Sequence, residues 1–243
     1  FVAYYVLFVF TDRFAREGIQ FERFYVSPLC APTRASLLTG QYSQRTGVWG
    51  VTHNKEAMRP EEVTLAEVLK AAGYRTGLFG KWHNGEQFPY TPTGQGFEEF
   101  FGFHNGHWNN YHDPMLLRGT RAEATKGFIA DVLTAEALRF VERQRARPFF
   151  CYLAYNTPHS PYQAPPELFE RYRARGLSAE LAAIYAMCEN VDTNVGRLLA
   201  RLEALQLRER TLVLFLTDNG PQTDRFNAGM RGRKGTVHEG GTR

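Results

Sequence analysis

The amino-acid sequence predicts a single α/β domain whose mostly parallel, mixed sheet is covered by helices on both faces. The 243 residues are 43% hydrophobic, which is enough apolar material to fill one core. Apolar runs typical of buried strands alternate along the chain with segments whose apolar residues recur at helical spacing. This alternation is typical of a sheet whose neighbouring strands are joined by helices.

The first half of the chain contributes two predicted strands and two helices. "YVLFVF" predicts a buried strand at 5–10, and a helix is expected to begin at Cys30. "TLAEVLKAAG" predicts a second helix, because Thr64 suits the N-cap position and a glycine follows the last periodic residue. "RTGLFG" then predicts a strand at 75–80.

The second half continues the same alternation. Apolar residues at helical spacing predict a helix at 128–144, and "PFFCYLAY" predicts a strand at 148–155. The longest helix is expected to begin near Ser178, because one continuous apolar stripe follows that residue. "TLVLFLT" predicts the last strand at 211–217.

Charge and cysteine content exclude several classes of protein. The 29 Lys and Arg residues and 25 Asp and Glu residues are mostly interspersed, whereas a nucleic-acid footprint is clustered, so no nucleic-acid partner is expected. Three widely spaced cysteines make neither a disulfide framework nor a zinc-binding CxxC pair. The apolar N-terminal run is too short to span a bilayer and lacks a basic leader, so neither a membrane span nor a signal peptide is expected in this chain.

Polar side chains follow each of the four predicted strands. They are Asp12 after the first, Lys81 and His83 after the second, His159 after the third, and Asp218 and Asn219 after the fourth. In an open α/β sheet, ligands bind in the crevice at the carboxyl ends of the strands. The sequence therefore predicts a binding site at this edge of the sheet.

These strand-end residues suggest a hard cation and an anionic ligand. Asp218 and Asn219 supply only oxygen atoms, so a metal there should be calcium or magnesium rather than zinc. The alternative is a polar turn, because Asp-Asn-Gly is a common turn sequence. Lys81 could bind an anionic group, and His83 could move protons near neutral pH. For His83 and for His159, a purely structural role is the alternative.

Cys30 has two interpretations from its surroundings alone. A cysteine at a helix N-terminus beside Arg34 would have a stabilised thiolate, which favours a nucleophile for acyl or phosphoryl transfer. The alternative is a small buried hydrophobic residue, an interpretation that suits Cys151 and Cys188. Neither explains why a proline and an arginine accompany Cys30.

"CAPTRASLLTG" resembles the signature of type I sulfatases, a family of the alkaline phosphatase superfamily. In that signature, Cys-x-Pro-x-Arg precedes a Leu-Thr-Gly helix end, and the cysteine is the substrate of a formylglycine-generating enzyme. Four later segments resemble further active-site segments of the family in the family's order: "GYRTGLFGKWH", "TPHSPY", "FLTDNG" and "GRKGTVHEGGTR". The five matches extend over nearly the whole chain, which is thereby identified as arylsulfatase-like.

The resemblance implies a nucleophile and the groups around it. Cys30 would become formylglycine, whose hydrated aldehyde attacks the sulfur of the substrate. Arg34 would hold the hydrate, and Lys81 would contact both the hydrate and the sulfate. His83 would accept a proton when sulfate is expelled.

The resemblance also implies a leaving-group side and a metal site. His159 and Lys234 would bind sulfate and assist the leaving oxygen. Asp218 and Asn219 would ligate calcium, in preference to magnesium, together with the formylglycine at position 30. Preplaced cations suit this reaction, because negative charge accumulates on the sulfuryl oxygens and on the leaving oxygen.

Asp12 lies where this sequence departs from the family pattern. In the family the first strand ends in two adjacent aspartates that ligate the metal, and a long loop precedes a segment like "RFAREG". Here "VLFVFTD" runs directly into that segment, so Asp12 corresponds either to the first metal aspartate or to the acid of the later segment. Residues 1–243 are expected to form a sulfatase catalytic domain without this loop and without the C-terminal subdomain.

The expected reaction is hydrolysis of an aryl or carbohydrate sulfate ester to an alcohol and inorganic sulfate. Two alternatives remain open: a phosphodiesterase or phosphonate hydrolase on the same scaffold, and an inactive sulfatase-like fragment that only binds its ligand. "HNGHWNNYHDP", residues 104–114, is polar and aromatic enough to line a sugar or aryl pocket. The resemblance implies a secreted or periplasmic protein, or a lysosomal one in a eukaryote.

Overall fold

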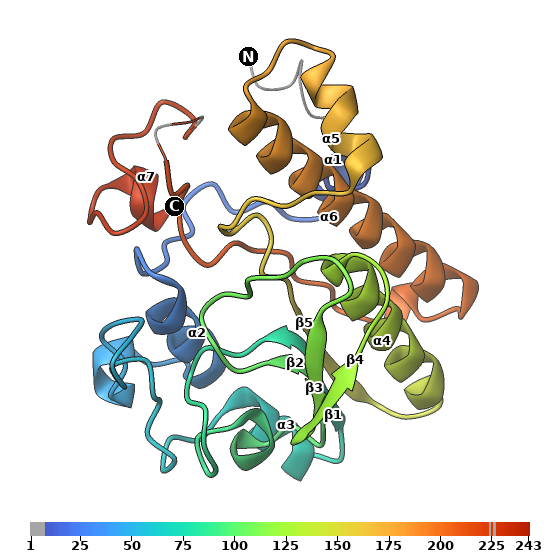
Figure 1. Ribbon diagram of the computed structural model, residues 1–243. Helices are drawn as coiled ribbons and strands as arrows, with labels where there is room; N and C mark the ends of the chain where they lie inside the picture. The colour runs from blue at the N-terminus through green and yellow to red at the C-terminus, as the bar shows by residue number, and fades with distance from the viewer. Residues whose placement is uncertain (1–7, 224, 226) are drawn as a thin grey trace.

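The computed structural model describes residues 8–223, 225 and 227–243, and it confirms the α/β class. A five-stranded mixed sheet runs in the order β4-β3-β2-β1-β5 (Figure 1). β1 lies between β2 and β5 and is parallel to both, whereas β3 and β4 add an antiparallel extension beside β2. The strands are β1 (Arg75–Lys81), β2 (Glu99–Phe103), β3 (Met115–Arg118), β4 (Arg121–Ala124) and β5 (Phe149–Ala154).

Seven α-helices lie within the described part of the chain. They are α1 (Val9–Glu17), α2 (Cys30–Thr39), α3 (Leu65–Ala71), α4 (Ile129–Gln144), α5 (Pro166–Arg173), α6 (Ala179–Ala204) and α7 (Glu239–Thr242). Three short 3₁₀ turns accompany them at Ser43–Thr46, Pro92–Gln95 and Arg208–Arg210. No helix in the described ranges is long and apolar enough to cross a membrane.

Helices cover both faces of the sheet, as the sequence predicts. Successive residues of a strand point to opposite faces, and in β1 Leu78 belongs to a buried cluster with α2 and α3, whereas Phe79 belongs to one with α4 and α6. Phe100 and Phe101 of β2 divide in the same way. In Figure 1 α2 and α3 accordingly lie on one side of the sheet and α4 on the other. The sheet edge is therefore held in place from both faces.

The predicted helix starts are confirmed, and each has a local cause. Thr64 caps α3 through a capping box, in which its side chain accepts from the Glu67 amide and the Glu67 carboxylate accepts from the Thr64 amide. The Ser178 side chain caps α6 in the simpler way, accepting from the Leu181 amide. α4 occupies the predicted range.

Two predicted strands are wrong wherever the structure describes them. The run 5–10 lies partly outside the described residues, and its end belongs to α1. The buried carboxylate of Asp192 in α6 accepts hydrogen bonds from the amides of Val9, Phe10 and Thr11, which satisfies the first N–H groups of a helix. The run 211–217 joins no strand ladder among the described residues, because an extended segment becomes a strand only where a neighbour shares its backbone hydrogen bonds.

Candidate active site

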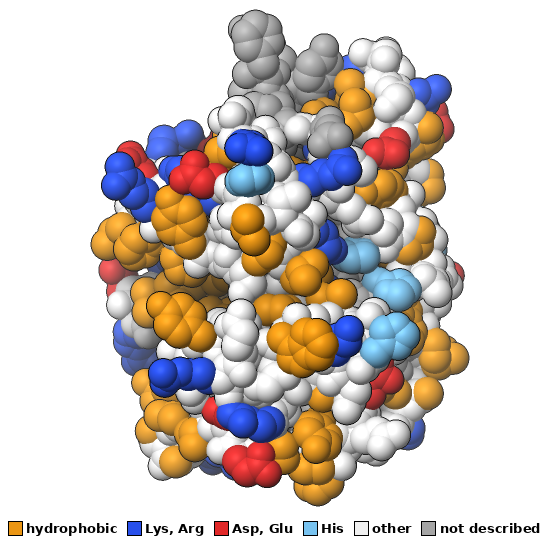
Figure 2. All heavy atoms as spheres, turned by 90° about the vertical axis from the view of Figure 1, so that its left-hand side faces the viewer, with side chains coloured by type: hydrophobic (Ala, Val, Ile, Leu, Met, Phe, Trp, Pro, Cys, Tyr) orange, Lys and Arg blue, Asp and Glu red, His pale blue; other side chains and the backbone are white. Residues whose placement is uncertain are grey.

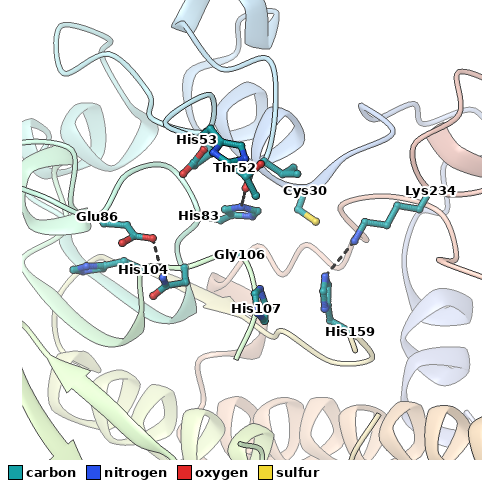
Figure 3. Close-up of a pocket in the computed structure, with 13 residues that line it drawn as sticks. Cys30, Thr52, His53, His83, Glu86, His104, Gly106, His107, His159 and Lys234 are labelled. Atoms are coloured by element: carbon teal, nitrogen blue, oxygen red, sulfur yellow. Dashed lines mark hydrogen bonds between the residues drawn. The ribbon is translucent and has the colours of Figure 1, made fainter. Parts of the chain in front are cut away.

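A pocket of about 430 Å³ opens at the edge of the sheet where β1 ends. Cys30, His83, His159 and Lys234 line it, so the structure brings together four of the residues that the sequence singles out (Figure 3). Five of the seven histidines of the chain line the same pocket. Figure 2 shows histidine side chains gathered on one face of the molecule with acidic and basic side chains beside them.

The local sequence around α2 places Cys30 and Arg34 on one side of the helix. Cys30 is the first helical residue and is only 3% exposed. Pro32 is tolerated because the N–H groups in the first turn of a helix have no carbonyl acceptor within the helix, so a proline there loses no hydrogen bond. Gly40 ends the helix in the left-handed conformation at φ 67°. Residues four apart lie above one another on a helix, so Arg34 follows directly beneath Cys30.

Arg34 links the helix to two other parts of the site. Its Nε and Nη2 atoms donate to Asp218 Oδ2 at 3.0 and 2.9 Å, and its Nη1 donates to the Lys81 carbonyl oxygen at 2.8 Å. Arg34 and Lys81 are both almost fully buried. A buried guanidinium with three satisfied donors is a rigid element, so Asp218 and the end of β1 are held against α2.

The electrostatics of this cluster are dominated by burial and by its cations. Burial and the charge of Arg34 lower the pKa of Lys81 to about 8, and electrostatic interactions with Cys30 and Asp218 oppose that shift. For Asp218 burial alone would raise the pKa, but Arg34 and Lys81 together lower it to about 2. At neutral pH Asp218 is therefore a carboxylate and most Lys81 side chains are protonated.

His83 is held in one tautomer that leaves a bare nitrogen. Its Nε2 lies 3.0 Å from the Val51 carbonyl oxygen, and because a carbonyl only accepts, Nε2 carries the proton. Nδ1 is buried without a partner among the described residues. Burial and then the charge of Lys81 lower the pKa of His83 to about 3, so the ring is neutral and Nδ1 can accept a proton.

His159 and Lys234 meet although 75 residues separate them. His159 Nδ1 lies 2.7 Å from the Ser160 carbonyl oxygen and therefore donates to it. Nε2 is then free to accept from Lys234 Nζ at 3.2 Å. Burial is the main cause that lowers the pKa of His159 to about 4, and Lys234 adds to it. Lys234 is thus the positive partner of a neutral imidazole (Figure 3).

The predicted metal ligands are brought together only in part. Asn219 Oδ1 is buried and has no hydrogen-bond partner within the described part of the chain, which suits an oxygen ligand for a hard cation. Asp218 lies next to Asn219 in the chain, but the Oδ2 atom of Asp218 already accepts a hydrogen bond from Arg34. Asp12 is exposed on α1, which packs against α6, and it is not brought to Asp218. Within the described ranges no three His, Cys, Asp or Glu side chains converge on a metal position, so these residues do not complete a calcium site.

Sequence reasoning missed one wall of the pocket. The loop at 51–56 contributes His53 and Glu56, and Glu86 lies just beyond the end of β1. No motif marks these residues, because the loop reaches the pocket only through tertiary contacts such as the Asn84 amide donating to the Glu56 carbonyl oxygen. The other wall comes from 104–107, inside the segment that the sequence suggested for a sugar or aryl pocket.

Comparison with known proteins assigns the chain to one family, the family that the five sequence segments resemble. The model of the sulfatase family matches residues 6–243. N-acetylgalactosamine-6-sulfatase of Canis lupus familiaris is 33% identical over 96% of this chain and 50% of the relative. Arylsulfatase A of Homo sapiens is also 33% identical, over 96% of this chain and 52% of its own length. The chain therefore spans about half the length of the curated relatives it matches.

Solved structures agree with that assignment. The crystal structure of Ps i-CgsB in complex with k-i-k-neocarrahexaose superposes with a TM-score of 0.91 at 28% identity, covering 98% of this chain and 59% of that one. The phosphonate monoester hydrolase SpPMH from Silicibacter pomeroyi gives a TM-score of 0.61 at 20% identity, covering 86% and 57%. The second likeness shows the fold alone.

Proposed function

We propose, because this chain belongs to the sulfatase family, that the whole protein hydrolyses organic sulfate esters to an alcohol and inorganic sulfate. One observation carries the proposal. Cys30 is buried at the first turn of α2 and lines a pocket together with His83 and the pair of His159 and Lys234. A sulfuryl group that entered this pocket would meet a nucleophile position, a proton acceptor and a cation.

The nucleophile position requires maturation of Cys30. A formylglycine-generating enzyme would convert the cysteine to formylglycine, whose hydrated aldehyde supplies the oxygen that attacks sulfur. The buried Cys30 interacts electrostatically with the positive charges of Arg34 and Lys81, so both cations would stabilise negative charge on that oxygen and on the sulfuryl group. Arg34 would hold the nucleophile, because its bonds to Asp218 and to β1 fix its position.

Proton transfers are assigned to the two histidine sites. When the S–O bond to the alcohol breaks, the leaving oxygen would take a proton from Lys234, whose Nζ lies 3.2 Å from His159 Nε2. When sulfate is then expelled from residue 30, the bare Nδ1 of His83 would take the proton that is released. His83 is neutral at pH 7, so it can accept this proton directly. His159 is also neutral, and its bond with Lys234 would hold that donor in place.

Further features follow from the same resemblance. Asp218 and Asn219 would supply two oxygen ligands to calcium, and no step is assigned to the metal because the described residues do not complete its shell. Residues 1–243 would form the catalytic domain, and the segment at Asp12 would lack one loop of the family. The substrate would be a sulfated small molecule or glycan, and the protein would act outside the cytoplasm or in a lysosome.

Sulfate release from an aryl sulfate and from a sugar sulfate tests the proposal. We expect turnover by the protein produced with a maturation enzyme, and loss of turnover with a retained fold in Cys30→Ala. Cys188→Ala is the matched control, because this cysteine lies in α6 and does not line the pocket. Faster hydrolysis of an aryl phosphate diester than of the aryl sulfate would favour the phosphodiesterase alternative. Ligand binding without any turnover would favour an inactive fragment.

A further inference from the structure

The charge of the pocket changes sign along its length. Figure 3 shows Lys234 and His159 at one end, Glu86 and His104 at the other, and Cys30 with His83 between them. Lys234 is the single lysine or arginine among the described residues that line the pocket. A substrate whose sulfuryl group sits at the cationic end therefore places its alcohol portion toward a wall that carries acids.

Glu86 is held on this wall without a cation to neutralise it. Its Oε1 atom accepts from Asn105 Nδ2 at 2.8 Å, and no lysine or arginine of the described chain pairs with it. The side chain is exposed, so its carboxylate can contact a ligand. Asn105 itself lines the pocket, and the bond between the two fixes the carboxylate while its other lone pairs remain free.

Glu56 and His104 supply unsatisfied polar atoms to the lining of the same pocket. Glu56 Oε2 and His104 Nε2 are both buried without a hydrogen-bond partner among the described residues. A buried polar atom without a hydrogen-bond partner reduces the stability of the fold, so we expect a ligand group or a water molecule to form a hydrogen bond with it. For Glu56, a carboxylate oxygen, that group must be a donor such as a hydroxyl.

We propose that Glu56 and Glu86 select the alcohol portion of the substrate: they accept hydrogen bonds from the hydroxyls of an uncharged sugar and disfavour a second anionic group in the pocket. The inference rests on the proposed function for the placement of the sulfuryl group. It identifies the substrate class as neutral sugar monosulfates rather than sugars that carry a second sulfate or a carboxylate beside the first.

The physical basis is the asymmetry between a hydroxyl and an anion. A hydroxyl donates to a carboxylate, whereas a sulfate ester has no proton to donate and is repelled at short range. Discrimination that relies on a repulsive element is a common route to specificity. Because Glu86 is exposed, solvent and salt screen the repulsion, and we expect a preference of about tenfold for the monosulfate at low salt.

Calorimetric binding of two probes to the Cys30→Ala protein tests the inference without turnover. The probes are galactose monosulfate and galactose disulfate, and we expect the monosulfate to bind about tenfold more tightly at low salt. In the same background Glu86→Gln should keep the bond from Asn105 and tighten disulfate binding about fivefold, with less effect on the monosulfate. Glu61→Gln is the matched control, because Glu61 is exposed and does not line the pocket.

The inference is overturned if the two sugars bind equally, if neither binds, or if Glu86→Gln leaves the ratio of dissociation constants unchanged. Aryl sulfate turnover by the protein with Cys30 intact reports on the proposed function separately. Turnover without discrimination would overturn the inference alone. A ratio that shifts in Glu86→Gln without any turnover would support the inference and overturn the proposed function.

Discussion

Gly106 is the position where a single methyl group should disturb His83. A Cβ atom built there would lie 2.4 Å from His83 Nε2 and 2.5 Å from Cε1, well inside the 3.0 Å that real Cβ atoms essentially never cross. In Gly106→Ala the imidazole or the loop must therefore move by more than about half an ångström. The bond of 3.0 Å from Nε2 to the Val51 carbonyl oxygen would lengthen or break.

A misplacement approaching 1 Å of a group that acts on the substrate can lower turnover by about 10²-fold. We therefore expect Gly106→Ala to lower kcat on an aryl sulfate by about 10- to 100-fold. KM should change much less, because the three atoms nearest to the added Cβ all belong to His83 and none to Lys81 or Lys234, the expected sulfate contacts. The overpacking should also reduce the free energy of unfolding by about 1–3 kcal/mol, which a denaturant titration would report.

Gly119→Ala separates lost positioning from general destabilisation. Gly119 lies in the turn between β3 and β4 at φ 62°, and a Cβ there meets nothing within 4 Å. The substitution should cost about 1 kcal/mol through backbone strain and leave kcat unchanged. Parental kcat in Gly106→Ala, or an equal loss in Gly119→Ala, would show that contact with Gly106 does not position His83.

Three further predictions concern the cations, the pH range and one helix cap. Lys81→Ala and His159→Ala should each lower sulfate ester turnover by about two orders of magnitude or more. His112→Ala should leave turnover nearly unchanged, because His112 does not line the pocket. Similar small losses of turnover in all three variants would argue against the proposed site. Because Lys81 has a pKa of about 8 and binds an anion only when protonated, turnover should fall as the pH rises through about 8; a pH profile that stays flat to pH 10 would contradict this role. Thr64→Ala should lower the free energy of unfolding by about 1–2 kcal/mol without changing kcat, and a stability equal to that of the parent protein would show that the capping box contributes nothing.

The part of the site that follows β1 and β5 was predictable, because the sequence shows where an apolar run typical of a buried strand gives way to polar residues. Lys81 is the last residue of β1, and β1 and β5 are parallel neighbours, so His83 and His159 emerge at the same edge. The helix that begins at Cys30 was equally predictable, because a proline in its first turn and a glycine after its end are local signals. These elements depend on interactions between residues close in sequence.

The remainder depended on tertiary contacts that no local pattern encodes. The segment 5–10 reads as a strand, yet its described end is helical because Asp192, far along the chain, binds the first amides of α1. The segment 211–217 pairs with no described strand, but Asp218 still reaches the site because Arg34 holds it. The wall that includes Glu56 carries no motif, so only the folded chain shows that it faces the pocket.

The proposed nucleophile is tested by the chemical state of residue 30 in active protein. Mass spectrometry of the peptide that trypsin releases after Arg23 and Arg34 would distinguish a cysteine from formylglycine in a preparation whose aryl sulfate turnover has been measured. We predict the aldehyde at position 30, in a proportion that rises with turnover from one preparation to the next. Unmodified cysteine throughout a preparation with undiminished turnover would contradict it.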